Sequence, residues 1–194
     1  MTIDKIQKCN TCDFFESEIK KCNYDIKNEN SNIDFNSISV SVLPTNAKWS
    51  DMEGFTSYKF GPFHFNFINE NNDTIAGISF YIYYNCHGKF NSSGHYLAGV
   101  TVAPQTIFAN PGCYFSCNVT ASDPLNFGTV IDPIAGINLN VQMQVKSYNN
   151  LILKRHHNLL TSYTSNDGLN IINQYLIVCV HGDSKAYVVT GYRY

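Results

Sequence analysis

Cysteine and histidine are the residues of this chain with the most versatile chemistry, and two pairs of them lie close in sequence. His87 follows Cys86 directly, and one residue separates Cys179 from His181. Side chains alternate between the two faces of a strand, so Cys179 and His181 would share a face whereas Cys86 and His87 would not. A thiol beside an imidazole could be half of a metal site or an activated nucleophile. A nucleophile also needs a base, an orienting group and an oxyanion site, and no such pattern is present, so we expect buried cysteines and turn-end histidines instead.

A second group of thiols lies near the amino terminus. Cys9 and Cys12 form a C-x2-C pair, and Cys22 follows ten residues later. Thiolates at this spacing suit a tetrahedral zinc ion, although the fourth ligand would have to come from elsewhere. The chain has seven cysteines, an odd number, so at least one is free or bonded to another chain. Three interpretations stay open: a zinc site, intermolecular disulfides through Cys9, Cys12 and Cys22, or incidental cysteines on a flexible arm.

The other reactive side chains form no active-site pattern. The acidic residues of the body lie at or near turn signals, which favours capping and solubility over a catalytic carboxylate pair. No nucleotide-binding loop, G-x-S-x-G elbow or H-E-x-x-H motif occurs in the sequence. We therefore predict a protein that is not an enzyme, with no catalytic residue, cofactor or resident metal.

The composition limits the partners. Of the 194 residues 14% are charged, against roughly 25% in ordinary soluble domains, and the formal net charge is -2. Nucleic-acid binding needs clustered Lys and Arg, so we predict no nucleic-acid partner. No apolar run approaches the ~20 residues of a membrane helix, and residues 1–10 lack the apolar segment of a secretory signal. We expect no transmembrane segment and leave the localisation open.

The elements that must position these residues are β-strands. Apolar and polar residues alternate from Ile137 to Val145 and from Cys113 to Ala121, the pattern of half-buried antiparallel strands. The second strand would bury Cys113 and Cys117. Phe63, Phe65 and Phe67 form a third inward set, and the nearly apolar segment 75–84 suits a central strand that is covered on both faces.

Turn signals separate about eight or nine such segments, which predicts an all-β fold. We expect an antiparallel β-sandwich over residues 37–194, with a jelly roll as the first choice. Residues 1–36 are expected to be an N-terminal arm and linker. Within this arm Phe15, Ile19 and Cys22 have the i, i+4, i+7 spacing of a short helix, and residues 23–36 have a linker-like polar composition.

The last 85 or so residues contain a familiar order of signals: Asn110-Pro111-Gly112-Cys113-Tyr114-Phe115-Ser116, then Gly182-Asp183, then Tyr187-Val188-Val189-Thr190-Gly191-Tyr192-Arg193-Tyr194. This order resembles that of complement-head and tumour-necrosis-factor-like jelly rolls. The resemblance implies a trimer-forming domain that serves in assembly or receptor contact.

The abundant tyrosines supply a candidate contact surface, made of Tyr81, Tyr83, Tyr192 and Tyr194 on the expected outer faces. Exposed aromatic sets serve subunit packing, glycan stacking or docking at a membrane interface. Our first hypothesis is a self-assembling structural protein, a homo-oligomeric subunit of a particle, fibre, spore or surface layer. The alternative is a lectin-like or toxin-like binding module that uses exposed tyrosines and Trp49 to recognise a glycan or a cell surface.

Overall fold

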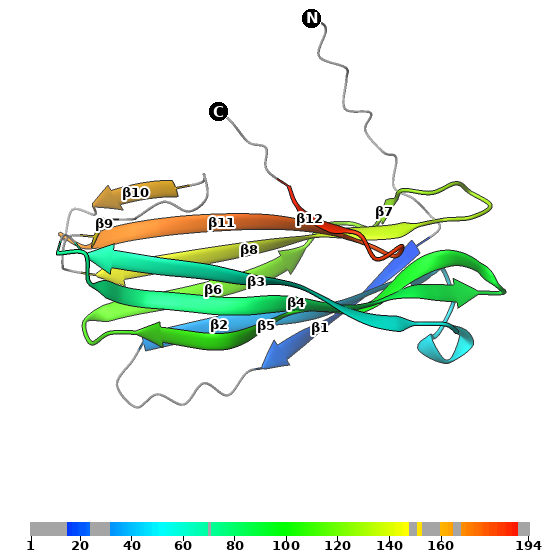
Figure 1. The fold of residues 1–194 in the computed structure, drawn as a ribbon, viewed down its shortest axis with the longest axis horizontal. Coiled ribbons are helices and arrows are strands. Elements are labelled where there is room, and N and C mark those ends of the chain that lie inside the picture. Colours follow the sequence, from blue (N-terminus) through cyan, green and yellow to red (C-terminus); the bar gives the residue numbers. More distant parts are fainter. Residues whose placement is uncertain are drawn as a thin grey trace, which may run out of the picture.

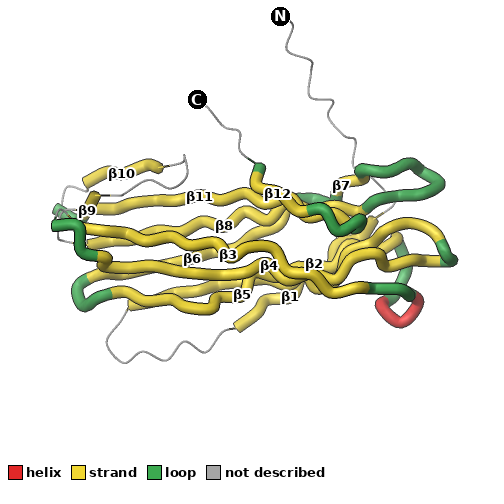
Figure 2. Tube along the Cα trace, viewed as in Figure 1, coloured by secondary structure: helices red, strands yellow, loops and turns green. Residues whose placement is uncertain are grey.

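The computed structural model describes residues 15–23, 32–69, 71–147, 151–152, 160–164 and 168–189. These residues form strands, turns and one short 3-10 helix, η1 (Trp49–Asp51), in an elongated molecule (Figures 1 and 2). The prediction of an all-β protein is therefore confirmed. The strands are β1 (Phe15–Asn23), β2 (Asn32–Pro44), β3 (Thr56–Asn69), β4 (Thr74–Phe90), β5 (Ser93–Ala109), β6 (Cys113–Ala121), β7 (Leu125–Asn126), β8 (Ala135–Ser147), β9 (Leu151–Ile152), β10 (Leu160–Thr164), β11 (Asn170–His181) and β12 (Ala186–Val188).

The strands belong to one mixed sheet that nearly closes on itself into a barrel. Its order is β10-β11-β8-β6-β2-β5-β4-β3-β9, with β1 beside β2, β12 beside β11 and β7 beside β8. Strand β2 joins two antiparallel runs, because residues 32–36 pair in parallel with β6 and residues 39–42 pair with β5. The strand order thus confirms neither two separate sheets nor a jelly roll. The reason is the length of β2, which lets one strand hydrogen-bond to both halves.

The core lies between the inner faces of this folded sheet. In β8 every second side chain from Ile137 to Val145 is buried, and β6 buries Cys113, Phe115 and Cys117 in the same way. Both alternating patterns in the sequence are confirmed. Phe67 of β3 meets Phe115 of β6 edge-on with ring centroids 5.9 Å apart, although the two strands are not neighbours in the sheet. This contact therefore crosses the interior.

Strand β4 is covered on both faces over part of its length, as its apolar sequence predicts. Residues 75–80 are all buried. On the outer face, Phe108 and Asn66 lie so close to Gly77 that an added Cβ would stand 2.8 Å from the Phe108 ring and 2.9 Å from the Asn66 side-chain oxygen. Further along the strand this cover ends, and Tyr83 is exposed.

The amino-terminal segment differs from its prediction. Residues 15–23 form strand β1, paired in register with residues 36–44 of β2, so the predicted helix is wrong. Phe15 is buried, with its ring centroid 6.0 Å from that of Tyr96, whereas Ile19 is 52% exposed. Pairing with β2 outweighs a weak helical spacing, because a short helix is marginal without a surface to dock on. The predicted arm boundary at residue 36 falls inside β2, and residues 32–36, predicted as linker, are part of the sheet.

Candidate binding site

The four cysteines that the structure places with their side chains are buried free thiols: Cys86, Cys113, Cys117 and Cys179. Burial raises the pKa of Cys86 to about 11 and that of Cys117 to about 12, so both are protonated at neutral pH. All four buried cysteines pack as small apolar groups, as the sequence predicts. Cys9 and Cys12 lie outside the described residues. Cys22 lies on β1 opposite Ser37, but its side chain is not described, so the proposed zinc site and disulfides stay predictions.

Cys179 and His181 share a face of β11, as the sequence predicts, and both contact Tyr187 of β12. Tyr187 pairs with Cys179 in the register, and its hydroxyl lies 3.3 Å from His181 Nε2. Burial raises the pKa of the Cys179 thiol, which opposes formation of a thiolate. The arrangement therefore anchors β12 rather than activating a nucleophile.

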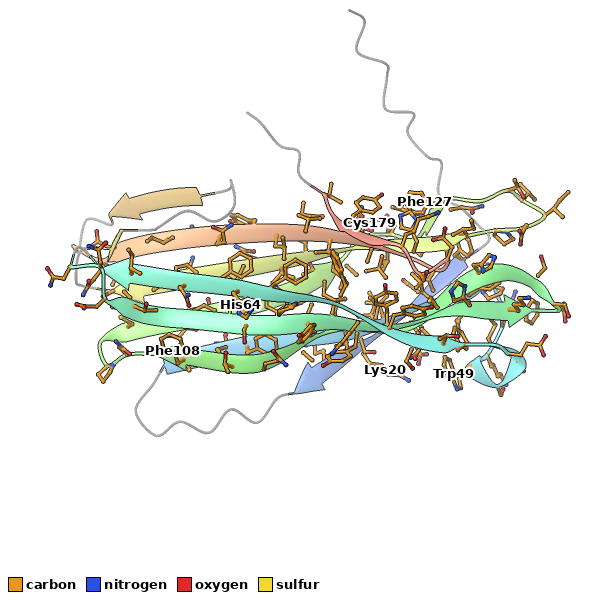
Figure 3. The ribbon with its side chains drawn as sticks, viewed as in Figure 1. Lys20, Trp49, His64, Phe108, Phe127 and Cys179 are labelled. Atoms are coloured by element: carbon orange, nitrogen blue, oxygen red, sulfur yellow. The ribbon has the colours of Figure 1, made fainter. Side chains whose placement is uncertain are left out.

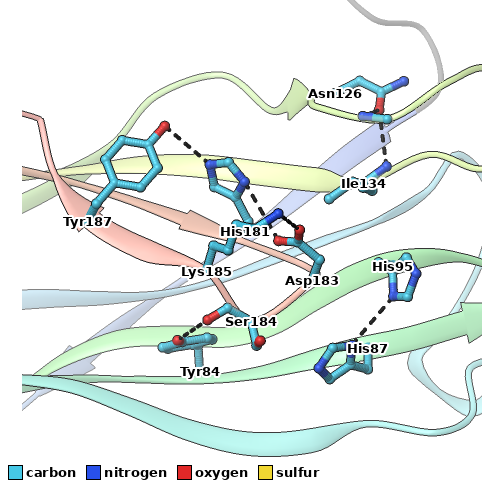
Figure 4. Close-up of polar contacts among 11 residues, drawn as sticks. Tyr84, His87, His95, Asn126, Ile134, His181, Asp183, Ser184, Lys185 and Tyr187 are labelled. Carbon is cyan, nitrogen blue, oxygen red and sulfur yellow. Dashed lines mark hydrogen bonds and ion pairs between the residues drawn. The ribbon is translucent and has the colours of Figure 1, made fainter.

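His181 is the centre of a polar cluster at the β11–β12 turn (Figure 4). Its ring stacks on Phe127 with centroids 3.8 Å apart, and its Nδ1 lies 3.8 Å from Asp183 Oδ1. Burial lowers the pKa of His181, and Asp183 only partly opposes this shift. Burial also acts to raise the pKa of Asp183, but the hydrogen bond and charge of Lys185 outweigh it and hold that pKa below its usual value. At neutral pH an uncharged imidazole therefore lies between Phe127 and Tyr187.

This cluster predicts a pH dependence of stability. The folded protein favours neutral His181, so as the pH falls through about 6.5 the unfolded chain binds the proton first and the free energy of unfolding decreases. This loss should continue down to the lowered pKa of the folded state. We expect His181→Gln to lose less stability than the wild type between pH 7.5 and 5.5 in urea titrations. The exposed His64 gives the control His64→Gln, which should keep the wild-type dependence. Equal losses in wild type and His181→Gln would contradict the prediction.

Two more histidines face each other on β4 and β5. The Nδ1 atoms of His87 and His95 are 3.5 Å apart (Figure 4). Backbone bonds fix both residues: the His87 N–H donates to Gly182 O at 2.7 Å, and the His95 N–H donates to Pro133 O at 2.8 Å. Two imidazoles are half of a tetrahedral ligand set. No group of three or more His, Cys, Asp or Glu residues in the described part of the chain could hold a metal ion. What joins the β4–β5 hairpin to the neighbouring segments is the pair of backbone bonds, one to Gly182 and one to Pro133.

Three segments form one end of the molecule, which we call the loop end: residues 47–55, 89–95 and 126–134. They lie at the right of Figure 1, where Figure 3 shows Trp49. Glu53 and Lys89 exchange backbone hydrogen bonds of 3.1 and 2.8 Å, and Ser93 Oγ donates to Ile131 O at 2.8 Å. Asn91 and Ser92 both have positive φ, the requirement of a tight two-residue hairpin turn. The three segments are thus linked side by side.

Among the described residues, most of the large apolar side chains that are more than half exposed lie at the loop end. Val130 is 70% exposed, Ile131 is 87% exposed, and Trp49 is 53% exposed. Trp49 stacks on Phe55, with ring centroids 4.6 Å apart and planes 15° apart, so one face of its indole is covered. Phe127 also lies partly in solvent over His181.

Hydrogen bonds hold the 126–134 segment in shape beneath its exposed apex. Asn126 Oδ1 accepts from the backbone N–H groups of Gly128 at 2.9 Å and Ile134 at 3.1 Å. The Thr129 N–H donates to Asp132 O, and the Asp132 N–H donates to Thr129 Oγ1, both at 3.0 Å. Asp132 Oδ1 accepts from the Gly94 N–H at 3.1 Å. The loop is therefore pre-organised, although its apical side chains have little contact with the rest of the protein.

The loop end has no excess of positive charge. Its charged residues are Lys48, Asp51, Glu53, Lys89 and Asp132. The carboxylates of Asp51 and Asp132 are engaged locally, since Asp51 Oδ2 accepts from the Lys48 backbone N–H at 2.8 Å and Asp132 caps Gly94. The apolar side chains thus stand among balanced charges.

The tyrosine surface predicted from the sequence is only partly described. Tyr81 and Tyr83 lie on the outer face of β4 with ring centroids 6.0 Å apart, and Lys59 Nζ lies 4.9 Å from the Tyr81 ring centroid. Tyr192 and Tyr194 lie outside the described residues. Sequence reasoning missed Phe127, Val130 and Ile131. The signal available was an apolar Val-Ile pair in a segment bounded by Pro124 and Pro133, where turn residues normally dominate.

The comparisons with known proteins give no relative. The chain matches no family model, no curated protein and no solved structure. Among the described residues, no helix has the length and apolar character to cross a membrane.

Proposed function

We propose that this protein is a non-enzymatic binding module that attaches to a partner surface through the loop end. The observation that carries the proposal is the rigid 126–134 loop, which holds Val130 and Ile131 in solvent. Burying one such side chain is worth about 1.5–3 kcal/mol, so an ordered loop that exposes two of them forgoes this gain in the free protein. Exposed apolar groups gathered at one place are typical of interaction sites.

The polar clusters support a binding role rather than a catalytic one. The thiols of Cys86 and Cys117 have raised pKa values and lie in the core. His181 is stacked between aromatic rings, and His87 and His95 bond to each other. The thiols fill the core, whereas His181 contacts β12 and the backbone N–H groups of His87 and His95 bond to residues 182 and 133 behind the loop end.

Self-assembly is the second candidate function, favoured by the outer face of β3–β4–β5. This face presents Tyr81 and Tyr83 with Lys59 as the neighbouring charge, and an aromatic face of low charge suits packing against another copy. In this proposal the arm cysteines would cross-link the subunits. The finer description of the fold is also a proposal: we infer a flattened sandwich, supported by the Phe67–Phe115 contact between facing layers. The jelly-roll connectivity has no support in the strand order.

Sedimentation velocity and a binding array separate the two functions. In sedimentation we expect a monomer over a wide concentration range. In this monomer acrylamide should quench the fluorescence of Trp49, the single tryptophan of the chain. On an array of immobilised glycans and lipids, Ile131→Asp should remove most of the binding. Phe108→Asp, at the opposite end of the molecule (Figure 3), should not. A mass that rises with concentration and returns to monomer in Tyr83→Asp would instead establish self-assembly.

A further inference from the structure

The side chains, backbone hydrogen bonds and charges of the loop end indicate which class of partner it binds. We propose that the loop end docks on the interface of a lipid bilayer, with Val130 and Ile131 inserted among the acyl chains and Trp49 at the level of the headgroups. This inference rests on the proposed binding module and names its partner. Three features of the loop end support it: the identity of the apical side chains, the state of the backbone beneath them, and the charge around them.

The apical side chains fit a hydrocarbon phase. Val130 and Ile131 are adjacent, 70% and 87% exposed, and carry no polar atom that could recognise a sugar hydroxyl. A glycan site needs directional donors and acceptors beside an aromatic platform, and the Trp49 ring already has one face covered by Phe55. An indole has an apolar body and a polar N–H, which is the reason that tryptophan is enriched at membrane–water interfaces.

Most of the backbone polar groups beneath the apex of the loop are paired within the protein, which lowers the cost of moving this part of the loop out of water. An unsatisfied peptide group costs several kcal/mol in hydrocarbon, so a loop can enter an apolar medium only when its polar groups are paired internally. In the 126–134 loop, the N–H groups of Phe127, Gly128, Thr129, Asp132 and Ile134 all donate within the loop. The Ile131 carbonyl accepts from Ser93 Oγ at 2.8 Å, directly at the apex. At the apex itself only this carbonyl is paired, since the N–H groups of Val130 and Ile131 have no hydrogen-bond partner among the described residues, so insertion would carry these two groups no deeper than the headgroup level.

The charges predict which bilayer is bound. Attraction to anionic lipids needs clustered Lys and Arg near the membrane surface. The loop end instead mixes Lys48 and Lys89 with Asp51, Glu53 and Asp132. We therefore expect binding to zwitterionic bilayers, driven by burial of apolar surface and little affected by anionic lipid or by salt.

The test uses the full chain with phosphatidylcholine vesicles, and with vesicles that also contain phosphatidylserine. Co-sedimentation should show binding to both, with little effect of phosphatidylserine or of salt. The emission of Trp49 should shift to the blue on binding, and brominated phosphatidylcholine should quench it. Because Trp49 is the single tryptophan, these signals report the loop end alone.

Matched variants identify the inserted side chains. Ile131→Asp should weaken the partition coefficient at least about tenfold, because an aliphatic anchor is lost and a charge is added. Ile131→Leu should bind like the wild type. Phe108→Asp adds the same charge at the opposite end and should bind like the wild type (Figure 3). Thermal melting should show all three variants folded, since Ile131 is 87% exposed and Phe108 lies partly exposed on the outer face of the sheet.

Three results would overturn the inference. A folded monomer that ignores both vesicles, or an Ile131→Asp variant that binds as tightly as the wild type, excludes insertion by this loop. Binding that requires phosphatidylserine and disappears with salt indicates charge attraction instead. If the protein ignores both kinds of vesicle but binds a glycan on the array in an Ile131-dependent way, the membrane inference fails and the proposed binding module stands. Failure of the binding module itself appears separately, as assembly in sedimentation.

Discussion

Gly182→Ala is expected to lower the free energy of unfolding by about 3 kcal/mol or more. Gly182 begins the β11–β12 turn where this turn meets β5, and a Cβ placed on it would stand 2.0 Å from the carbonyl oxygen of His95 and 2.6 Å from its carbonyl carbon. Both atoms belong to the backbone, so no side-chain rotation relieves the clash. The turn would have to move away from β5 and from its hairpin partner β4. This movement would break the hydrogen bond that the His87 N–H donates to Gly182 O. Urea unfolding monitored by Trp49 fluorescence measures the loss.

Gly112→Ala is the matched control for this substitution. Gly112 has a φ of +82°, and no atom lies within 4 Å of a Cβ built on it. Alanine at this position should lower the free energy of unfolding by only about 1–2 kcal/mol, the cost of a left-handed backbone conformation for a residue with a Cβ. The expected order is therefore a larger loss at position 182 than at 112. The reverse order would show that the β11–β12 turn does not lie against β5, and would remove the support that the loop end receives from behind.

The strands that bury one face and expose the other could be predicted from the sequence. The period-two patterns of 113–121 and 137–145 specify buried faces, because a shift of one residue would expose every apolar side chain. The amino-terminal strand was not predictable in this way. Residues 16–21 are exposed on β1, so no burial pattern distinguishes strand from helix there, and only pairing with β2 decides it. The sheet order depends on the same kind of long-range pairing, since β2 contacts β6 at one end and β5 at the other.

The candidate site was harder to predict than the fold. Buried cysteines follow from strand alternation, so the outcome for Cys113 and Cys117 could be predicted from the sequence. The exposure of Val130 and Ile131 could not, because apolar residues in a sequence usually signal the core. Their exposure results from the hydrogen bonds of Asn126, Thr129 and Asp132, which shape the loop so that its apex points outward. The sequence predicts an exposed Trp49, and the structure places this residue at the same end, 53% exposed.

Phe115→Ala is expected to cost about 3–5 kcal/mol of the free energy of unfolding, the range for a buried phenylalanine. Phe115 is fully buried on β6, and its edge contacts Phe67 of β3 across the interior. Truncation leaves a cavity between β6 and β3, which face each other across the interior. Each strand is held in place by its own neighbours in the sheet, so neither can move in to fill the cavity. Phe108→Ala is the control, since Phe108 is partly exposed on the outer face, and should cost about 1 kcal/mol.

A double-mutant cycle with Phe67→Ala tests whether the two layers meet as the fold requires. Aromatic pairs in contact contribute about 0.5–1.5 kcal/mol beyond the area that they bury, so the double variant should be less destabilised than the sum of the single variants by about that amount. Distant residues would add within about 0.3–0.5 kcal/mol. Additivity at positions 67 and 115 would therefore mean that β3 does not lie over β6, and that the sheet is open rather than nearly closed. A measured coupling would place the two halves joined by β2 face to face, which is the arrangement that fixes β4, β5 and the β11–β12 turn behind the loop end.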